Sequence, residues 1–479
     1  MWMPDSNPTD NLLARLGPDV VLKGDEARFA ASFDNARLSF MPEAVLRPRD
    51  EDDVALILRM ANERKVPVTP RGAGTATTGA ASPVRGGWVL DMSGWRNLHI
   101  DADAGVAYAQ PGVITGELCA EAEKLGWCYP PDPSSNKYCT IGGNIACNAG
   151  GMRAAKYGVT RDFVMALEGF MPTGEWVRWG ADLRKYAAGY NMRDLWVGSE
   201  GTLGVVTGAV LKLLPKPEAR ATFLIAFADE LAALAASRAI VAARLNPAIM
   251  EFLDRQSVRC TIDEGLVLPF DTETVCAPAI LLVELDGAPE RLLEDGTKLE
   301  ALVKADATAF RRAESAAEAE LLWAVRRKCS KAMFRLADGK LNEDVVVPPR
   351  SQDELMQFTL ELMARTGLAT PVFGHAADGN FHVHVMYHRG NPDECRKAEQ
   401  AVGEIMRKVV ELGGAISGEH GIGLAKTPFL HLQHSAAEIG AMRAVKMALD
   451  PNCIMNPGKI FEPFRVWEHE IVRVTLPWD

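Results

Sequence analysis

The sequence predicts an α+β protein with more than one domain. At 479 residues the chain is longer than a single hydrophobic core usually organises. Residues 40–215 combine glycine-rich turns with short strand-like runs, whereas longer strand-like and helix-like segments alternate beyond them. The Pro-Lys-Pro sequence at 215–217 separates these two regions and therefore predicts a domain boundary.

The first region contains one clear helix signal, at 51–64. The acidic stretch RDEDD (49–53) precedes it, and acidic side chains favour the N-terminal end of a helix. Short apolar runs separated by Asp, Gly and Asn turns then predict strands over 66–70, 87–93 and 104–112. The segment 195–217 closes this region.

The second region predicts an alternation of strands and helices. Strands are expected over 221–227, 278–285 and 344–348, and helices over 229–245, after 285, near 314–335 and over 351–365. The helix at 393–412 has the clearest pattern, because its apolar residues recur at spacings of 4, 3, 4 and 3 before two glycines end it: Ala398, Val402, Ile405, Val409 and Leu412. We therefore expect three parts, at 1–217, 218–412 and 413–479.

The composition excludes several classes of protein. The net charge is −11 and no basic block occurs, which argues against a nucleic-acid partner but not against a small anionic substrate. No segment has the apolar length of a membrane span, and the first residues lack the pattern of a signal peptide. Nine cysteines without any C-x-x-C spacing argue against an iron–sulfur site and suit reduced thiols. We expect a soluble cytoplasmic protein.

Three glycine-rich stretches lie in the first region, at 70–79, 130–151 and 196–206. The first is not a Rossmann G-x-G-x-x-G motif, because Thr77 occupies the third glycine position, and no P-loop motif occurs. Glycine still permits tight turns that direct backbone N–H groups at one anion, and Arg71 would add positive charge there. One such loop is weak evidence for phosphate binding; three within 140 residues are stronger.

These stretches carry a family resemblance. PRGAGT (70–75), PPDPSS (130–135), TIGGNIACNAGG (140–151) and VGSEGTLGVVT (197–207) resemble the FAD domain of vanillyl-alcohol-oxidase-type flavoproteins. The chain is most similar to the FAD-linked D-2-hydroxyacid dehydrogenases, which include D-lactate and D-2-hydroxyglutarate dehydrogenase and the flavin subunit of glycolate oxidase. The resemblance spans about residues 40–461. It implies a two-part FAD-binding domain, an α+β cap domain that binds substrate, and a C-terminal helical segment that returns to the FAD domain.

The resemblance implies a set of FAD-binding residues. They are Pro70, Arg71, Gly72, Ala73, Gly74, Thr75, Gly79, Pro131, Asp132, Ser135, Gly142, Gly143, Asn144, Asn148, Gly201, Thr202, Val206 and Asn456. Some members attach FAD through a histidine in the first loop. No histidine occurs there in this chain, so we expect FAD to be bound non-covalently.

A histidine-rich segment, FGHAADGNFHVHV (373–385), lies in the second region. Asp378-Gly379 predicts a two-residue hairpin turn of type I′. His375 and His382 would then lie directly opposite each other, with Cβ atoms ~4.5–5.5 Å apart, and His384 would share their face. Two imidazoles on a sheet face are more often structural than metal-binding, and they form an incomplete metal site.

The segment GGAISGEHGIG (413–423) supplies a further candidate ligand. Glycines flank Glu419 and His420, so we expect them on a tight loop. In the resembled family these two segments are paired signatures. They imply that His375, His382 and Glu419 bind a divalent metal and that His420 is the base. Zinc suits two histidines and a carboxylate, while manganese, iron or cobalt are also compatible with these ligands.

The implied reaction is the oxidation of a small D-2-hydroxy acid, with D-lactate or glycolate favoured. Its carboxylate and hydroxyl can chelate one metal ion, His420 would take the hydroxyl proton, and hydride would pass to the flavin. By position in the family, Arg326 would hold the substrate carboxylate and Lys340 a second carboxylate, although Arg326 also suits a solvated helix face. His384 would face the substrate. Ser330 stands where 2-hydroxyglutarate-type members have a threonine. The choice of substrate therefore stays open, with D-2-hydroxyglutarate and D-malate as the alternatives to D-lactate and glycolate.

The electron acceptor stays open between a quinone, a cytochrome, an electron-transfer flavoprotein and an iron–sulfur subunit. An acceptor at the membrane would bring the protein to its inner face as a peripheral partner. We expect a homodimer. The rival interpretations are another flavoenzyme of the same fold, a non-catalytic flavin electron-relay subunit, and a metal-dependent hydrolase, which would leave the three glycine-rich loops unexplained.

Overall fold

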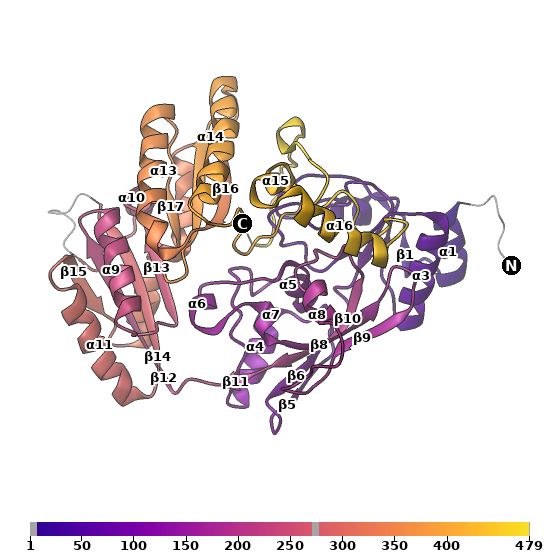
Figure 1. Ribbon diagram of the computed structural model, residues 1–479, viewed down its shortest axis with the longest axis horizontal. Coiled ribbons are helices and arrows are strands. Elements are labelled where there is room, and N and C mark those ends of the chain that lie inside the picture. Colours follow the sequence, from indigo (N-terminus) through magenta and orange to yellow (C-terminus); the bar gives the residue numbers. More distant parts are fainter. Residues whose placement is uncertain (1–6, 271–276, 479) are drawn as a thin grey trace. The chain divides into compact units, whose positions relative to one another are not determined.

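The computed structural model describes residues 7–270 and 277–478 (Figure 1). The chain folds into two compact units. The first unit comprises Met1–Gly151, Gly158–Lys216 and Glu419–Asp479, and the second comprises Met152–Tyr157 and Pro217–Gly418. A short excursion of the chain at 152–157 therefore packs with the second unit, and nothing in the sequence indicated this.

The first unit contains the glycine-rich region and the C-terminal segment. Its helices are α1 (Pro8–Leu16), α2 (Asp25–Ala30), α3 (Glu51–Arg64), α4 (Thr115–Lys124), α5 (Ile141–Cys147), α7 (Thr160–Phe163), α8 (Met192–Trp196), α15 (Leu430–Gln433) and α16 (Ala436–Leu449). Its strands are β1 (Val21–Leu22), β2 (Ala44–Leu46), β3 (Val68–Arg71), β4 (Trp88–Asp91), β5 (Leu98–Asp101), β6 (Val106–Ala109), β7 (Trp127–Cys128), β8 (Val164–Phe170), β9 (Trp176–Gly180), β10 (Val205–Lys212) and β11 (Leu214–Pro215).

These strands form two main sheets and one short pair. The first sheet has the order β1-β2-β4-β3, in which β4 is parallel to both β2 and β3. The second sheet is antiparallel, with the order β5-β6-β10-β8-β9, and β11 pairs with β7. The prediction of a helix at 51–64 and of strands near 66–70, 87–93 and 104–112 is confirmed by α3, β3, β4 and β6.

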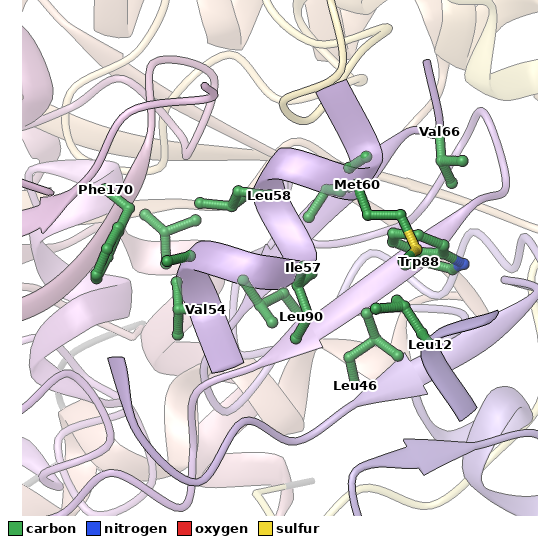
Figure 2. Close-up of a cluster of buried hydrophobic side chains, with 14 of the residues drawn as sticks. Leu12, Leu46, Val54, Ile57, Leu58, Met60, Val66, Trp88, Leu90 and Phe170 are labelled. Atoms are coloured by element: carbon green, nitrogen blue, oxygen red, sulfur yellow. The ribbon is translucent and has the colours of Figure 1, made fainter. Parts of the chain in front are cut away.

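Helix α3 covers the first sheet because its apolar side chains share one face. The Asp50 side chain accepts a hydrogen bond from the Asp53 N–H and so caps the first turn. Figure 2 shows the buried residues of this core: Leu12, Leu46, Val54, Ile57, Leu58, Met60, Val66, Trp88, Leu90 and Phe170. This core holds β3 and β4 in place, and the first glycine-rich loop leaves the end of β3.

The C-terminal segment joins the same sheet. The Val68 N–H donates to the Ile454 carbonyl oxygen at 2.7 Å, and the Asn456 N–H donates to the Val68 carbonyl oxygen at 2.7 Å. These bonds place residues 454–456 beside β3, as a parallel bridge between Val68 and Met455. The C-terminal segment is therefore tied to the first sheet of this unit.

The second unit contains one antiparallel sheet and its helices. The helices are α6 (Ala154–Tyr157), α9 (Glu230–Ala242), α10 (Arg255–Asp263), α11 (Pro289–Val303), α12 (Ala316–Ala332), α13 (Gln352–Thr366) and α14 (Pro392–Glu411). The strands are β12 (Ala219–Phe227), β13 (Ile249–Leu253), β14 (Ala279–Gly287), β15 (Ala307–Arg312), β16 (Gly339–Val346), β17 (Val372–His375) and β18 (Asn380–Tyr387), in the order β15-β12-β14-β13-β17-β18-β16.

Helices α10 and α12 pack against one face of this sheet. Leu253 and Phe373 from the strands and Val258, Val325 and Cys329 from the helices belong to one buried cluster. The face under α12 therefore combines an apolar core with the polar side chains described below. The strands and helices predicted for this region are present, including the long α12 and the amphipathic α14.

The histidine hairpin has a different register from the one that the sequence predicted. His375 lies opposite Asn380, and Phe373 lies opposite His382. The prediction that His375 and His382 lie directly opposite each other is therefore wrong. A shift of two residues leaves side-chain parity unchanged, so both histidines still share one face, and their ring centroids are 5.5 Å apart.

The turn itself explains the difference. Residues 376–379 form it, whereas a type I′ turn would contain only Asp378 and Gly379. That turn type requires a positive φ at both central positions, and of these two residues only Gly379 has one, at 82°. The Asp378 side chain instead accepts a hydrogen bond from the Asn380 N–H at 3.1 Å.

Two expectations from composition concern the whole chain. Among the described residues, no helix is both long and apolar enough to cross a membrane. The eight cysteines that the structure describes are free thiols, and Cys276 lies outside the described residues.

Candidate active site

The loop at 72–80 in the first unit presents unused backbone donors. Within the described part of the chain, its N–H groups make no hydrogen bond to another protein group. Several of these residues are buried or half-buried, and the buried Thr77 hydroxyl also lacks a partner among the described residues. Because buried N–H groups are almost always paired in folded proteins, this loop has the character of an anion-binding cradle.

The second glycine-rich stretch packs directly on this loop. Thr140 caps α5 by accepting a hydrogen bond from the Gly143 N–H at 3.2 Å. A Cβ atom at Gly72 would lie 2.3 Å from the Thr140 Oγ1 atom, so only glycine allows the two loops to approach this closely. Similarly, a Cβ atom at Gly151 would lie 2.1 Å from the Asp132 carbonyl oxygen.

Glu200, in the third glycine-rich stretch, holds the loop that follows His420. Its Oε1 and Oε2 atoms accept hydrogen bonds from the N–H groups of Ile422 and Gly423, at 2.7 and 2.8 Å. Burial raises the pKa of Glu200 to about 7, although these hydrogen bonds act in the opposite direction. The sequence analysis predicted Gly201 and Thr202 as FAD-binding residues but did not identify Glu200. An acidic residue between two glycines of this motif could have indicated it.

The loop with Glu419 and His420 also contacts the other glycine-rich loops. The Thr78 hydroxyl donates to the His420 carbonyl oxygen at 3.2 Å, and the Leu424 N–H donates to the Thr78 carbonyl oxygen at 2.7 Å. A Cβ atom at Gly150 would lie 3.0 Å from the Glu419 Oε2 atom. The first unit thus gathers all three glycine-rich stretches around the Glu-His loop.

Asn456 completes this part of the site. Its Nδ2 atom donates to the carbonyl oxygens of Ala80 and Glu200, at 2.8 and 2.7 Å, and its Oδ1 atom accepts from the Lys459 Nζ atom at 3.2 Å. Burial lowers the pKa of Lys459 to about 8. Asn456 therefore links the end of the 72–80 loop to the third glycine-rich stretch through hydrogen bonds.

Other predicted FAD-binding side chains are used inside the protein. The Arg71 guanidinium turns back over Gly74 and donates to the Ala81 carbonyl oxygen at 3.4 Å, and burial lowers its pKa. The Asn144 Nδ2 atom donates to the Thr115 hydroxyl at 2.7 Å. Likewise, the Asn148 Oδ1 atom accepts from the Arg161 N–H at 2.9 Å, so these residues shape the loops.

The second unit gathers polar side chains on the sheet face beneath α12. Pairing of β13, β17, β18 and β16 aligns Glu251 with His375 and His382 with Asp344. Glu251, His375, His382, His384 and Asp344 are all buried. In addition, the Arg326 guanidinium from α12 lies 4.2 Å above the Phe373 ring.

Glu251 bonds to two of the predicted site residues at once. Its Oε1 atom bonds to the His375 Nδ1 atom, and its Oε2 atom accepts from the Arg326 Nε atom. Burial alone would raise the pKa of Glu251, but its interactions with His375 and Arg326 lower it below the ordinary value. Among the described residues, the two terminal NH₂ groups of Arg326 have no hydrogen-bond partner, so they remain available to a ligand.

His384 and Lys340 extend the same face. The His384 Nδ1 atom donates to the Pro371 carbonyl oxygen at 3.2 Å, and burial lowers the pKa of the imidazole well below its ordinary value. Its buried Nε2 atom has no partner among the described residues. The Lys340 Nζ atom donates to the Ser330 hydroxyl at 2.7 Å, and burial lowers its pKa to about 8.

Asp344 connects this face to the Glu-His segment through the chain. Its Oδ2 atom accepts hydrogen bonds from the Gly418 N–H at 2.8 Å and from the Ser417 hydroxyl at 3.1 Å. Gly418 is the last residue of the second unit and Glu419 the first of the next segment of the first unit. Asp344 therefore holds the end of the second unit, at Ser417 and Gly418, against β16.

Sequence reasoning missed two acidic residues on this face, Glu251 and Asp344. Glu251 lies within the apolar stretch AIMEFLD (248–254), and an acidic residue inside a buried strand is itself a signal. Asp344 directly precedes the apolar run VVVP (345–348), which is a weaker signal of a buried acidic residue.

Comparison with known proteins agrees with this architecture. The family model for the FAD binding domain matches residues 42–180, and the model for the C-terminal domain of FAD linked oxidases matches residues 216–460. The solved structure of p-cresol methylhydroxylase with substrate bound aligns with a TM-score of 0.76 at 17% identity, covering 95% of this chain and 96% of that one. At that identity the likeness shows the fold alone.

Two curated relatives match at higher identity. Glycolate oxidase subunit GlcD of Bacillus subtilis (strain 168) is 40% identical over 456 residues, which are 94% of this chain and 96% of the relative. D-lactate dehydrogenase of Anaerostipes hadrus is 36% identical over 456 residues, or 93% and 95% of the two chains. The expected fold is confirmed, and the chain belongs to the FAD-linked oxidoreductases of the vanillyl-alcohol-oxidase type, in the branch of glycolate oxidase subunits and D-lactate dehydrogenases.

Proposed function

We propose that this protein oxidises a small D-2-hydroxy acid, glycolate or D-lactate, to the corresponding 2-oxo acid. The observation that carries the proposal is the sheet face where Glu251 holds both Arg326 and His375. The relatives at 36–40% identity, named for glycolate and D-lactate, support this substrate class. D-2-hydroxyglutarate and D-malate are the alternative substrates.

The residues of the first unit fit FAD. The unused N–H groups at 72–80 suit its pyrophosphate, because successive backbone donors bind phosphate oxygens well. The residues named above around the three glycine-rich stretches would line the cofactor, without a covalent histidine link. When bound, FAD accepts the hydride that leaves C2 of the substrate.

The donor set of the histidine face fits a divalent metal. Because Glu251 engages Nδ1 of His375, the Nε2 atom is the one that would carry a lone pair for a metal. We propose His375, His382 and Glu419 as the ligands and zinc as the metal, with manganese, iron or cobalt compatible by ligand type. When bound, such a metal lowers the pKa of a coordinated hydroxyl group.

Arg326 is the proposed partner of the substrate carboxylate. Its Nε atom is engaged by Glu251, and its two terminal NH₂ groups form a planar fork that matches a carboxylate. The Phe373 ring beneath the guanidinium restricts its position. A substrate held by this fork would have a fixed orientation before its C–H bond breaks.

His420 is the proposed base, and its imidazole would accept the proton of the substrate hydroxyl. His384 would face the substrate, with its Nε2 atom as a neutral acceptor because its Nδ1 atom already donates to Pro371. Lys340 would bind a second carboxylate only in a longer diacid. With a monocarboxylate such as lactate, its Nζ atom would keep its hydrogen bond to the Ser330 hydroxyl.

The electron acceptor, the oligomeric state and the location belong to the proposal as well. Electrons would leave to a quinone, a cytochrome, an electron-transfer flavoprotein or an iron–sulfur subunit. We propose a homodimer in the cytoplasm that meets a membrane-bound acceptor peripherally. A second candidate function, a flavin subunit that only relays electrons, predicts flavin that no hydroxy acid reduces.

The decisive experiment is anaerobic bleaching of the flavin absorbance by D- and L-lactate, glycolate, D-malate and D-2-hydroxyglutarate. The parent protein should be reduced rapidly by glycolate or D-lactate, and His420→Ala should lose this reduction. His388→Ala, at an exposed histidine of the second unit, is the matched control and should behave as the parent. A yellow parent protein that none of these acids reduces would refute the proposed oxidation and favour the electron-relay function.

A further inference from the structure

Glu251 occupies a position where a carboxylate is costly. It lies in the middle of β13, a central strand, and its side chain is fully buried on the sheet face that carries His375 and that Arg326 of α12 contacts. An ionised carboxylate in such surroundings must be paired and hydrogen-bonded, because desolvation of a lone charge costs several kcal/mol. The residue therefore requires an explanation beyond the filling of the core.

Both oxygens of Glu251 are engaged, and by different elements. The Oε1 atom bonds to His375 on β17, the neighbouring strand, and the Oε2 atom bonds to Arg326 on α12, which packs on the sheet face. The side chains of Arg326 and His375 are only 14% and 5% exposed, so both of these partners are largely shielded from water. One carboxylate thus determines how far apart and in which orientation an imidazole and a guanidinium lie.

A buried ion pair is by itself weak evidence for a role in stability. Buried ion pairs are often replaced by apolar residues of similar volume without loss of stability, because attraction barely repays desolvation. Leu253, Val325 and Phe373 on the same face already form a buried apolar cluster without it. The gain from Glu251 therefore lies in the placement of its two partners.

We propose that Glu251 is a positioning residue that sets Arg326 and His375 at one fixed spacing, so that a single 2-hydroxy acid meets both groups. Oε1 holds the His375 ring with Nε2 directed at the metal site, and Oε2 holds the guanidinium with its fork directed at the substrate carboxylate. The inference rests on the proposed function for the identity of these two ligands. It adds a residue that couples metal affinity to carboxylate affinity.

The test compares Glu251→Gln, Glu251→Asp and the control Glu284→Gln in the FAD-loaded full-length protein. Glu284 is a buried glutamate of the same sheet, on β14, and its nearest ion-pair partner, Arg220, is 3.9 Å away. Two readouts are independent of turnover: Zn²⁺ affinity by competition with a chelator, and the affinity for oxalate, read from the change in the flavin spectrum.

We expect Glu251→Gln to lose roughly 10–100-fold in Zn²⁺ affinity, the range found when the partner of a ligating histidine is removed. Oxalate affinity should fall at least about tenfold, since an amide cannot accept from both partners. Glu251→Asp keeps the charge but is one methylene shorter, so it should lose affinity for one ligand or both. Glu284→Gln should stay within about twofold of the parent for each.

If the Glu251 variants do not fold, a further variant distinguishes the effect on carboxylate affinity from the effect on metal affinity. Arg326→Lys keeps a positive charge but has no Nε–H for Oε2, so it should lose oxalate affinity while Zn²⁺ affinity stays near that of the parent. Parent-like oxalate binding in this variant would count against the coupling.

Unchanged Zn²⁺ and oxalate affinities in Glu251→Gln would overturn the inference and leave the proposed oxidation intact. A parent protein that binds no divalent metal would overturn it too. Conversely, a parent protein that no hydroxy acid reduces, but whose Zn²⁺ affinity still falls only in the Glu251 variants, would sustain the role of Glu251 and refute the substrate assignment.

Discussion

Lys340 offers the sharpest quantitative prediction, because it is a half-buried cation without a carboxylate among its hydrogen-bond partners. Its Nζ atom donates to the hydroxyl and the carbonyl oxygen of Ser330, at 2.7 and 3.1 Å, and lies 4.8 Å above the Phe334 ring. Burial lowers its pKa from the ordinary 10.5 to about 8. We predict that Lys340→Met stabilises the protein near pH 7.

The magnitude follows from the pKa difference. At pH 7 both the folded and the unfolded chain carry the proton, and the lower pKa in the folded state means that the charge costs the folded state about 3 kcal/mol. Methionine removes this cost but also the hydrogen bonding to Ser330, which contributes about 1–1.5 kcal/mol. The expected net gain in the free energy of unfolding is about 2 kcal/mol.

The stability gained by Lys340→Met should depend on pH. Because the folded-state pKa is depressed, the unfolded chain alone holds the proton between pH 8 and 10.5, and the stability of the parent rises with pH across that window. At pH 9.5 the folded chain has lost this proton, and only about 1 kcal/mol of the cost remains. The advantage of Lys340→Met should therefore shrink to nearly zero.

The assay is denaturant unfolding of the parent and Lys340→Met at pH 7, 8 and 9.5, with equal slopes as the condition for comparison. A variant that is no more stable at pH 7, or whose advantage does not decline by pH 9.5, would refute the reasoning.

Three further predictions concern the loop at 72–80, the proposed metal and Glu200. Gly72→Ala places a Cβ atom 2.3 Å from Thr140 Oγ1 and should lower the flavin content of the purified protein, measured by visible absorbance, whereas Gly94→Ala, whose Cβ atom would meet nothing within 4 Å, should not. Removal of divalent metal by a chelator should leave the flavin bound but slow its reduction by glycolate or D-lactate at least about 100-fold, with recovery on addition of Zn²⁺; an unaffected rate would contradict the proposed metal. Burial raises the pKa of Glu200 to about 7, so its contribution to stability is fully present below pH 4.5 and is lost as the pH rises through 7. Glu200→Gln should flatten that decline in unfolding experiments and, with only one acceptor for Ile422 and Gly423, slow flavin reduction; a parallel decline in both proteins would argue against it.

The sequence alone determined the elements whose signals are local. The helix at 51–64 was predicted from its acidic start, and the helix at 393–412 from its apolar spacing of 4, 3, 4 and 3, because both signals depend only on near neighbours in the chain. The glycine-rich motifs indicated the FAD-binding family for a related reason. Their backbone geometry is set by the residue types within each loop.

The register of the histidine hairpin shows where local signals fail. Asp378-Gly379 is typical of a type I′ turn, but positive φ occurs at Gly379 and not at Asp378, so the turn takes four residues. The observed register differs from the predicted one by two residues, so each side chain still points to the predicted face of the sheet. That is why the shared face of the three histidines was predicted correctly from a wrong pairing.

Tertiary structure alone decided which distant residues meet. Glu251 contacts Arg326 and His375 across 75 and 124 residues of sequence, and Glu200 reaches Ile422 across 222. These contacts depend on strand order, β13 beside β17, and on the helix that covers the sheet. Strand order is the outcome of packing the whole unit, and no short stretch of the chain encodes it, so the partners of the predicted site residues emerged only in the folded structure.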